Sequence, residues 1–207
     1  YYAGEDELTV LKKIWDGLLA KVNTNQGLDE ADRFTLAISA CYISLGDWMK
    51  EIPDTLNDGP LGTLFKSQIL DRRVEEGLLG RIEVLSSVTD ATSVKVRKQY
   101  EENPFPRWSV LSPNKTSTVG ETLQSLFPHF KAPGKLFGRC SILIPGCGTG
   151  QQPIQEALRY PTCQLTAIDL SARSLAFAMC RSDEYGISNL RFLQGDILSF
   201  NSGEGQF

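Results

Sequence analysis

The residues best suited to hold a ligand are a glycine-rich turn and two aspartates further along the chain. Gly146, Gly148 and Gly150 alternate in the sequence Pro-Gly-Cys-Gly-Thr-Gly, directly after a short apolar run. Glycine lets the backbone turn tightly and approach a ligand without a clash at Cβ. Asp169 and Asp196 each follow a later apolar run, and a carboxylate can accept hydrogen bonds from both hydroxyls of a ribose. Together these features predict a site for a ligand that contains a nucleoside.

The spacing of these residues narrows the class of ligand. Asp169 lies 23 positions after Gly146, close to the step of about 20 residues from a glycine loop to a ribose-binding carboxylate. A dinucleotide loop has the pattern G-x-G-x-x-G, but here Gly150 comes one residue early and Gln151 stands in the expected position. The Gly-Lys-Ser/Thr sequence of a triphosphate-binding loop does not occur. The pattern therefore disfavours an NAD-dependent enzyme and a P-loop enzyme.

A parallel sheet is needed to bring the glycine turn and the two aspartates together. The apolar runs at 140–144, 164–168 and 190–193 predict three strands, with helical patterns between them. Ser171 is suited to begin the second helix and Gly186 to end it. Right-handed crossovers in this order make half of a Rossmann-like, doubly wound parallel sheet. Ligands of such sheets bind beyond the carboxyl ends of the strands.

Three segments at those strand ends carry a family resemblance. They are Ile-Leu-Ile-Pro-Gly-Cys-Gly-Thr-Gly (142–150), Ala-Ile-Asp-Leu-Ser (167–171) and Gln-Gly-Asp-Ile-Leu (194–198). In this order they resemble the class I S-adenosylmethionine-dependent methyltransferases. The resemblance implies an α/β fold and S-adenosylmethionine as the cofactor.

The resemblance also implies a role for each segment. The glycine loop, with Gly146, Cys147, Gly148 and Gly150, would lie under the methionyl part of the cofactor. Asp169, followed by Leu170, would hold the ribose, and Asp196 with the backbone of Ile197 would read the adenine.

One position departs from the family pattern. Pro145 stands where many members have Asp or Glu, near the amino-acid end of the cofactor. The ammonium group of the cofactor would then have to be bound by backbone carbonyls or by another segment of the chain.

A second, narrower resemblance lies upstream, in Val-Arg-Lys-Gln-Tyr-Glu-Glu-Asn-Pro-Phe-Pro-Arg-Trp (96–108). It is similar to a segment that precedes the methyltransferase domain in a bacterial group, where this domain often follows tetratricopeptide repeats. We expect the segment to cover the cofactor mouth, with Tyr100 or Arg107 meeting the methionyl carboxylate, which the planar fork of arginine suits. The alternative is that its Pro, Phe and Trp side chains simply pack the helical part against the sheet.

The elements divide the chain into two predicted regions. Residues 1–134 form a helical region, with a lid or linker at 100–120, and residues 135–207 form a partial Rossmann-like methyltransferase domain. Apolar residues three or four apart predict helices over 8–22 and 31–48, the second with Asp29 as its N-cap and Phe34 on its apolar face. Residues 75–85 are interpreted as a weaker helix.

The end of the sequence suggests an incomplete sheet. Gln206-Phe207 is interpreted as the entry to a fourth strand, before which the sheet is truncated. We therefore expect a fragment that is inactive by itself, completed by a missing C-terminal portion or by a protein partner.

Composition excludes several functional classes. A formal net charge of -4 disfavours nucleic acid as a partner. No apolar run is long enough to span a membrane, and no leader pattern opens the chain, so a cytoplasmic location is expected. Five cysteines without a C-x-x-C pair indicate reduced thiols and neither a disulfide framework nor a zinc cluster. With one histidine, no His-rich metal triad is possible, and no metal is expected.

The leading functional hypothesis is an S-adenosylmethionine-dependent methyltransferase acting on an unidentified acceptor, which is a protein, a peptide or a small molecule. Displacement at a sulfonium methyl needs mainly alignment and proximity, so the absence of an obvious nucleophile is expected, and no catalytic residue is named. The alternative is a non-catalytic S-adenosylmethionine-binding or protein-interaction module with a degenerate methyltransferase fold, for which Pro145 would be a mark of decay.

Overall fold

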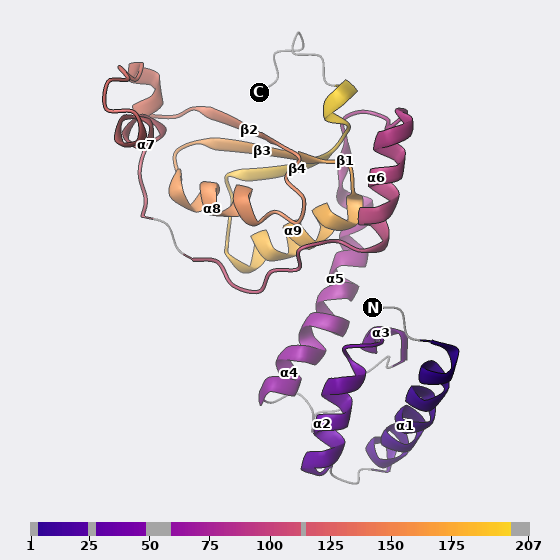
Figure 1. Ribbon diagram of the computed structural model, residues 1–207. Coiled ribbons are helices and arrows are strands. Elements are labelled where there is room, and N and C mark those ends of the chain that lie inside the picture. Colours follow the sequence, from indigo (N-terminus) through magenta and orange to yellow (C-terminus); the bar gives the residue numbers. More distant parts are fainter. Residues whose placement is uncertain (1–3, 25–27, 49–58, 113–114, 200–207) are drawn as a thin grey trace. The chain divides into compact units, whose positions relative to one another are not determined.

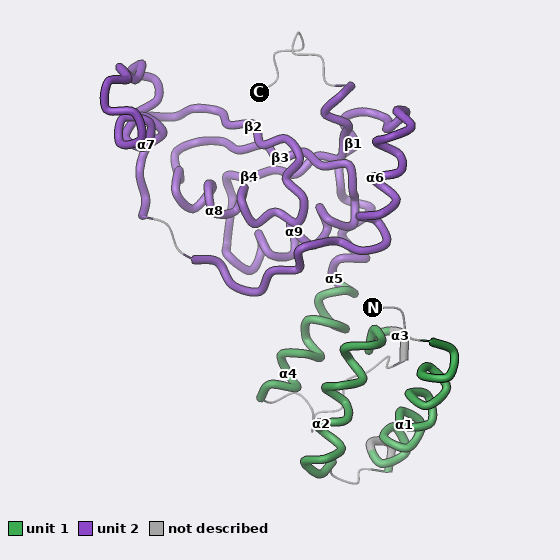
Figure 2. The backbone as a smooth tube through the Cα atoms, in the orientation of Figure 1, with its two compact units in different colours: residues 1–73 green, residues 74–207 purple. Residues whose placement is uncertain are grey.

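The computed structural model describes residues 4–24, 28–48, 59–112 and 115–199, and it divides the chain into two compact units (Figure 1). Unit 1 is residues 1–73 and unit 2 is residues 74–207 (Figure 2). The sequence pattern instead predicts the boundary at residue 134. Residues 74–134 belong with the α/β unit because they supply a strand to its sheet and a helix, α6, that packs against α9. The expected strand entry at Gln206-Phe207 lies outside the described residues.

Unit 1 is helical, as the sequence predicts. Its elements are α1 (Glu5–Asn23), α2 (Glu30–Ser39), α3 (Leu45–Trp48), α4 (Gly59–Phe65), a π-helical turn (Lys66–Leu70) and the beginning of α5 (Asp71–Leu78). Asp29 begins α2 through a capping box with Asp32, in agreement with its predicted capping role. The buried core consists of Trp15, Leu18, Leu36, Leu45, Leu61, Phe65 and Ile69.

Unit 2 is an α/β unit. After the rest of α5, its elements are η3 (Leu79–Arg81), β1 (Glu83–Val84), α6 (Ala91–Glu102), α7 (Val119–Leu126), η4 (Gly134–Phe137), β2 (Ser141–Pro145), α8 (Gln151–Arg159), β3 (Gln164–Asp169), α9 (Ala172–Glu184), β4 (Leu190–Gln194) and η5 (Ile197–Ser199). The predicted α/β fold is confirmed, and β2, β3 and β4 lie where the three apolar runs predict strands.

The sheet has four parallel strands in the order β1-β4-β3-β2. The strand β1 corrects the sequence prediction, which interprets residues 75–85 as helix. The α-helix α5 ends at Leu78, and the backbone N–H of Leu85 donates to the carbonyl of Gln194 at 2.8 Å. A two-residue strand carries almost no local pattern, so its pairing with β4 is what defines it.

The helices α8 and α9 lie on one face of the sheet (Figure 1). Both crossovers step in the same direction along the strand order, and right-handed connections then place both helices on the same side. Leu165, Ala167 and Phe192 of the sheet join Ile154 of α8 and Phe177 of α9 in one buried core. This core fixes the strand ends from which the candidate site is built.

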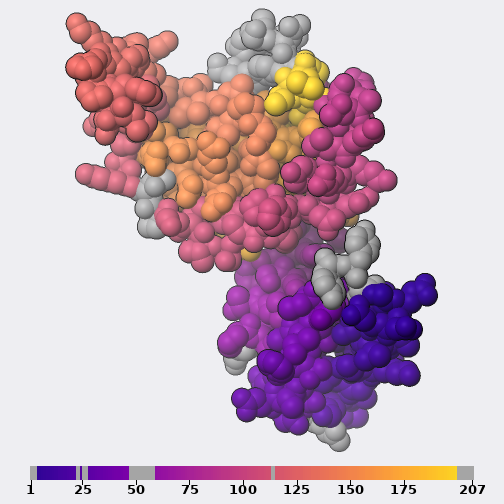
Figure 3. All heavy atoms as spheres, viewed as in Figure 1, coloured from indigo at the N-terminus to yellow at the C-terminus, as the bar shows by residue number. Residues whose placement is uncertain are grey.

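A small lobe of unit 2 contains α7 and η4 (Figure 3). The two elements pack closely at Gly120, where a Cβ would lie 2.8 Å from the ring of Phe137. The lobe exposes Leu126, Phe127 and Phe130.

Among the described residues, no helix is both long and apolar enough to cross a membrane.

Candidate cofactor site

The glycine loop is a tight turn fastened to the neighbouring strand. Gly146, Gly148 and Gly150 have φ angles of 67°, 54° and 81°, in the left-handed region that favours glycine. The N–H of Cys147 donates to the carbonyl of Ile168 at 3.0 Å, and the N–H of Gly150 donates to the carbonyl of Cys147 at 3.0 Å. The loop therefore begins at the end of β2, is held by the end of β3 and leads into α8.

Gly150 is required by packing as well as by its backbone conformation. A Cβ at this position would lie 2.4 Å from the Cβ of Ala178, which is fully buried on α9. The last residue of the loop therefore touches the helix that follows β3, and any side chain would push the two apart.

Asp169 connects the loop to the helix that follows it. One carboxylate oxygen accepts from the N–H of Gly148 at 2.8 Å, and the other accepts from the N–H of Ser171 at 2.9 Å. Each oxygen has a further lone pair, and the residue is only half-buried, so the carboxylate can still accept from ribose hydroxyls. The adjacent Leu170 is held through its carbonyl, which accepts from the side chain of Gln194 at 2.9 Å.

Asp196 lies beside Asp169 at the same edge of the sheet. The N–H of Gly195 donates to the carbonyl of Asp169 at 3.0 Å, which ties the two segments together. The carboxylate of Asp196 is buried and accepts from the N–H of Leu198 at 2.9 Å. Ile197 is 49% exposed at this edge.

Ser86 is a residue of this site that the sequence analysis missed. It follows β1, and its hydroxyl oxygen accepts from the N–H of Asp196 at 3.1 Å and lies 3.0 Å from the hydroxyl of Ser199. No motif marks it, because its role depends on the unexpected pairing of β1 with β4.

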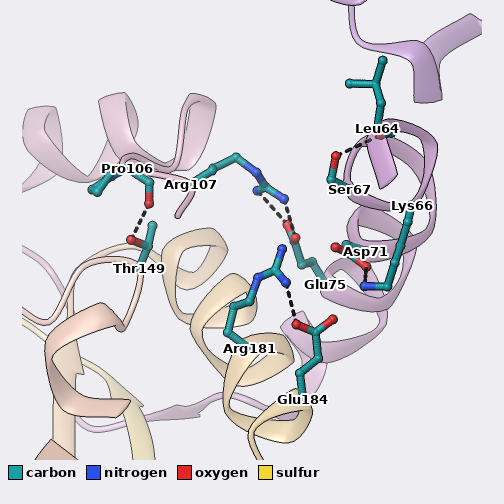
Figure 4. A network of polar contacts seen from close by, with 10 residues as sticks. All are labelled: Leu64, Lys66, Ser67, Asp71, Glu75, Pro106, Arg107, Thr149, Arg181 and Glu184. Carbon is teal, nitrogen blue, oxygen red and sulfur yellow. Dashed lines mark hydrogen bonds and ion pairs between the residues drawn. The ribbon is translucent and has the colours of Figure 1, made fainter. Parts of the chain in front are cut away.

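The upstream segment docks on the glycine loop. The indole N–H of Trp108 donates to the carbonyl of Thr149 at 3.0 Å. The hydroxyl of Thr149 donates to the carbonyl of Pro106 at 2.6 Å (Figure 4). Trp108 is buried and meets the ring of Phe177 edge-on at 5.9 Å between centroids. The packing role that the sequence left open for this segment is therefore present, and it is centred on the loop itself.

Arg107 already has a carboxylate partner within unit 2. Its guanidinium donates to both oxygens of Glu75, at 2.6 and 3.0 Å (Figure 4). It also lies over the ring of Phe177, at 4.5 Å from the centroid. The bidentate geometry expected for a cofactor carboxylate is thus made with Glu75 instead.

Tyr100, the other candidate for the methionyl carboxylate, lies on α6 and is 38% exposed. The next residue, Glu101, accepts from the N–H of Ala172 at 2.6 Å, at the first turn of α9. This contact brings α6 to the same edge of the sheet as Asp169, and nothing in the local sequence of Glu101 indicated it.

Cys147 acts here as a small neutral side chain. Burial raises the pKa of its thiol, and the neighbouring carboxylate of Asp169 raises it further. A thiol in such an environment stays protonated, which argues against a nucleophilic role.

Comparisons with known proteins agree with the motifs. Residues 142–207 match the family described as "Methyltransferase domain". The release factor glutamine methyltransferase of Chlorobaculum tepidum is 43% identical over 60 residues, which are 28% of this chain and 20% of that protein. The trans-aconitate 2-methyltransferase of Deinococcus radiodurans is 46% identical over 52 residues, 25% of this chain and 19% of that protein. The matched part therefore spans about a fifth of the length of each relative.

A solved structure of coclaurine N-methyltransferase, bound to N-methylheliamine and SAH, is 18% identical. The match covers 64% of this chain and 46% of that one, with a TM-score of 0.29. The family match begins at Ile142 in β2 and includes the glycine loop, Asp169 and Asp196. From residue 142 onward the chain is therefore similar to a methyltransferase domain, in agreement with the class I motifs, and the cofactor of that family is S-adenosylmethionine.

Proposed function

We propose that the chain binds S-adenosylmethionine at the carboxyl ends of β2, β3 and β4 and is part of an enzyme that transfers its methyl group. The observation that carries the proposal is the position of Asp169. Its carboxylate is fixed between the N–H groups of Gly148 and Ser171, so it is oriented before any ligand arrives. The acceptor is a protein, a peptide or a small molecule.

Each group at this edge has a proposed task. The open backbone of the glycine loop lies under the methionyl part, since a Cβ at Gly146 or Gly148 would have no atom within 4 Å apart from the neighbouring residues. Asp169 accepts from the ribose hydroxyls, with Leu170 beside it, and Asp196 with the backbone of Ile197 reads the adenine. The cofactor supplies a methyl group on a sulfonium, and the chain supplies alignment.

Two residues are proposed to hold the methionyl carboxylate, Tyr100 and Arg107. Tyr100 lies on α6 and is 38% exposed. Arg107 would have to exchange Glu75 for the ligand. Pro145 supplies no charge for the ammonium group, so its acceptors are backbone carbonyls near the loop or groups of another segment of the chain.

Calorimetry on the full chain tests the cofactor site. S-adenosylmethionine and S-adenosylhomocysteine are expected to bind and NAD is not. The D169A variant is expected to weaken binding about tenfold or more, because two charge-assisted hydrogen bonds are lost. D183A, which removes an exposed aspartate of α9, serves as the matched control and should bind like the parent. Equal affinity of D169A and the parent would exclude this ribose site.

The amino-acid end is tested with a truncated ligand. If Arg107 or Tyr100 holds the methionyl carboxylate, R107A or Y100F weakens the binding of S-adenosylhomocysteine. The binding of methylthioadenosine, which lacks the amino-acid group, should not change. An equal loss of affinity for both ligands in R107A would show instead that the ion pair of Arg107 with Glu75 only shapes the loop. E75Q adds a control, because it removes the negative charge that faces Arg107 and one of its two acceptors, while keeping Arg107 itself.

Transfer itself is tested with cofactor that is isotopically labelled at the methyl group. The full-length protein is incubated with cell extract, and label in an acceptor supports an enzyme. Tight binding without transfer to protein, peptide or small-molecule fractions would favour the non-catalytic module.

A further inference from the structure

Two cysteines meet at the beginning of the sheet, at the end opposite the candidate cofactor site. The Sγ atoms of Cys140 and Cys163 are 2.9 Å apart. Cys140 directly precedes β2 and Cys163 directly precedes β3, and the N–H of Gln164 donates to the carbonyl of Cys140 at 2.9 Å. The β2 strand begins on the side of α7, whereas the glycine loop follows its other end (Figure 1).

This position suits a disulfide. The first paired residues of the two strands are Ser141 and Gln164, so the two cysteines lie side by side across adjacent strands. Neighbouring strands are about 4.8 Å apart, within the range of about 4.4–6.8 Å between Cα atoms that a disulfide spans. A bond between these sulfur atoms therefore requires no rearrangement of the strands.

The two thiols differ in access. Cys163 is 1% exposed, whereas Cys140 is half-buried and lines a shallow depression of about 490 Å³. The depression is also lined by Arg139, which is exposed, and by Thr162. A small disulfide that carries carboxylates can therefore approach Cys140 beside the positive charge of Arg139.

We propose that Cys140 and Cys163 are a redox-active pair that a low-molecular-weight disulfide such as oxidised glutathione converts into an intramolecular disulfide. The thiolate of Cys140 attacks one sulfur of the small disulfide and releases one small thiolate. The thiolate of Cys163 then attacks the mixed disulfide and releases the second. The protein loses two electrons and two protons, and the small disulfide becomes two thiols.

The disulfide would restrain the segment that contains the glycine loop without contacting the cofactor site. The loop that it closes, residues 140–163, contains the glycine loop and all of α8. A cross-link of this length stabilises mainly by restricting the unfolded chain. Burial and the neighbouring Cys163 raise the pKa of the Cys140 thiol to about 11, so the exchange is slow at neutral pH and accelerates as the pH rises.

The experiment uses the reduced full chain, treated with oxidised glutathione at mildly alkaline pH. Free thiols are then alkylated in denaturant and peptides are mapped by mass spectrometry. We expect a linked peptide pair containing Cys140 and Cys163, with three of the five cysteines alkylated. The melting temperature of unit 2 should rise by about 5–10 °C and return after dithiothreitol, while S-adenosylhomocysteine affinity changes less than about twofold.

Two variants give the matched comparison. C41S removes an exposed cysteine elsewhere and should keep both the linked peptide and the temperature shift. C140S should lose both. A stable mixed disulfide at Cys140 with Cys163 still free would overturn the proposal, as would a linked peptide that involves any other cysteine. Because the parent chain gives the peptide map, the test does not depend on the folding of a variant, and it is independent of methyl transfer.

Discussion

The glycines of the loop differ in what they tolerate. Gly146 and Gly148 have positive φ angles but open space where a Cβ would be, whereas Gly150 combines a positive φ with a close approach to Ala178. The first two are free to face a ligand, and the third is needed to pack the loop on α9. The alternating motif therefore serves two purposes at once.

Gly150→Ala should destabilise unit 2 by about 2–4 kcal/mol, because a left-handed alanine and a forced contact with Ala178 both add cost. Urea unfolding measures the change. Gly134→Ala is the control, since a Cβ there meets no atom within 4 Å, and it should change stability by less than about 0.5 kcal/mol. If the two variants unfold alike, the loop does not need this close contact.

At the scale of elements, β1 is what completes the site edge. It adds a strand beside β4 and delivers Ser86 to the backbone of Asp196. The segment 106–108 adds a second support through Thr149, and Glu75 of α5 anchors that segment through Arg107. Residues far upstream of the family match therefore hold the loops that it identifies.

Ser86→Ala tests the contribution of β1. The N–H of the buried Asp196 would lose its acceptor, which costs about 1–3 kcal/mol. We expect adenosine and S-adenosylhomocysteine to bind several-fold more weakly, measured by calorimetry. Ser87→Ala, one residue further and exposed, should bind as the parent does. Unchanged adenosine affinity in Ser86→Ala would separate β1 from adenine recognition.

At the scale of the whole molecule, the described residues form two separate cores. Leu36 lies in the core of unit 1 and Ile154 lies in the core of unit 2, and both are almost fully buried. Units with their own cores tend to unfold as separate cooperative steps.

Calorimetry should therefore show two transitions for the reduced chain. Leu36→Ala should lower the midpoint temperature of only one transition and Ile154→Ala that of only the other. Each substitution should reduce the free energy of unfolding of its unit by about 2–5 kcal/mol, because a buried aliphatic side chain is lost. A single transition that both substitutions lower equally would show that the two cores unfold as one.

The sequence by itself determined the chemistry-bearing motifs and the elements that carry them. The apolar runs followed by Gly146, Asp169 and Asp196 were enough to predict that these residues meet at one edge of the sheet. Strand–helix alternation with right-handed crossovers makes the strands parallel, so their carboxyl ends lie together. Local capping signals were equally reliable, as Asp29 and Ser171 show, because they act within a few residues.

Tertiary structure alone decided which residues support the motifs and which helix faces are buried. Spacing placed Phe34 on the inner face of its helix, yet it is 67% exposed, and Leu36 is buried instead. The partners Ser86 and Asp196, and likewise Cys140 and Cys163, are joined by strand pairing. Such contacts depend on which strands become neighbours, and local sequence does not encode that choice.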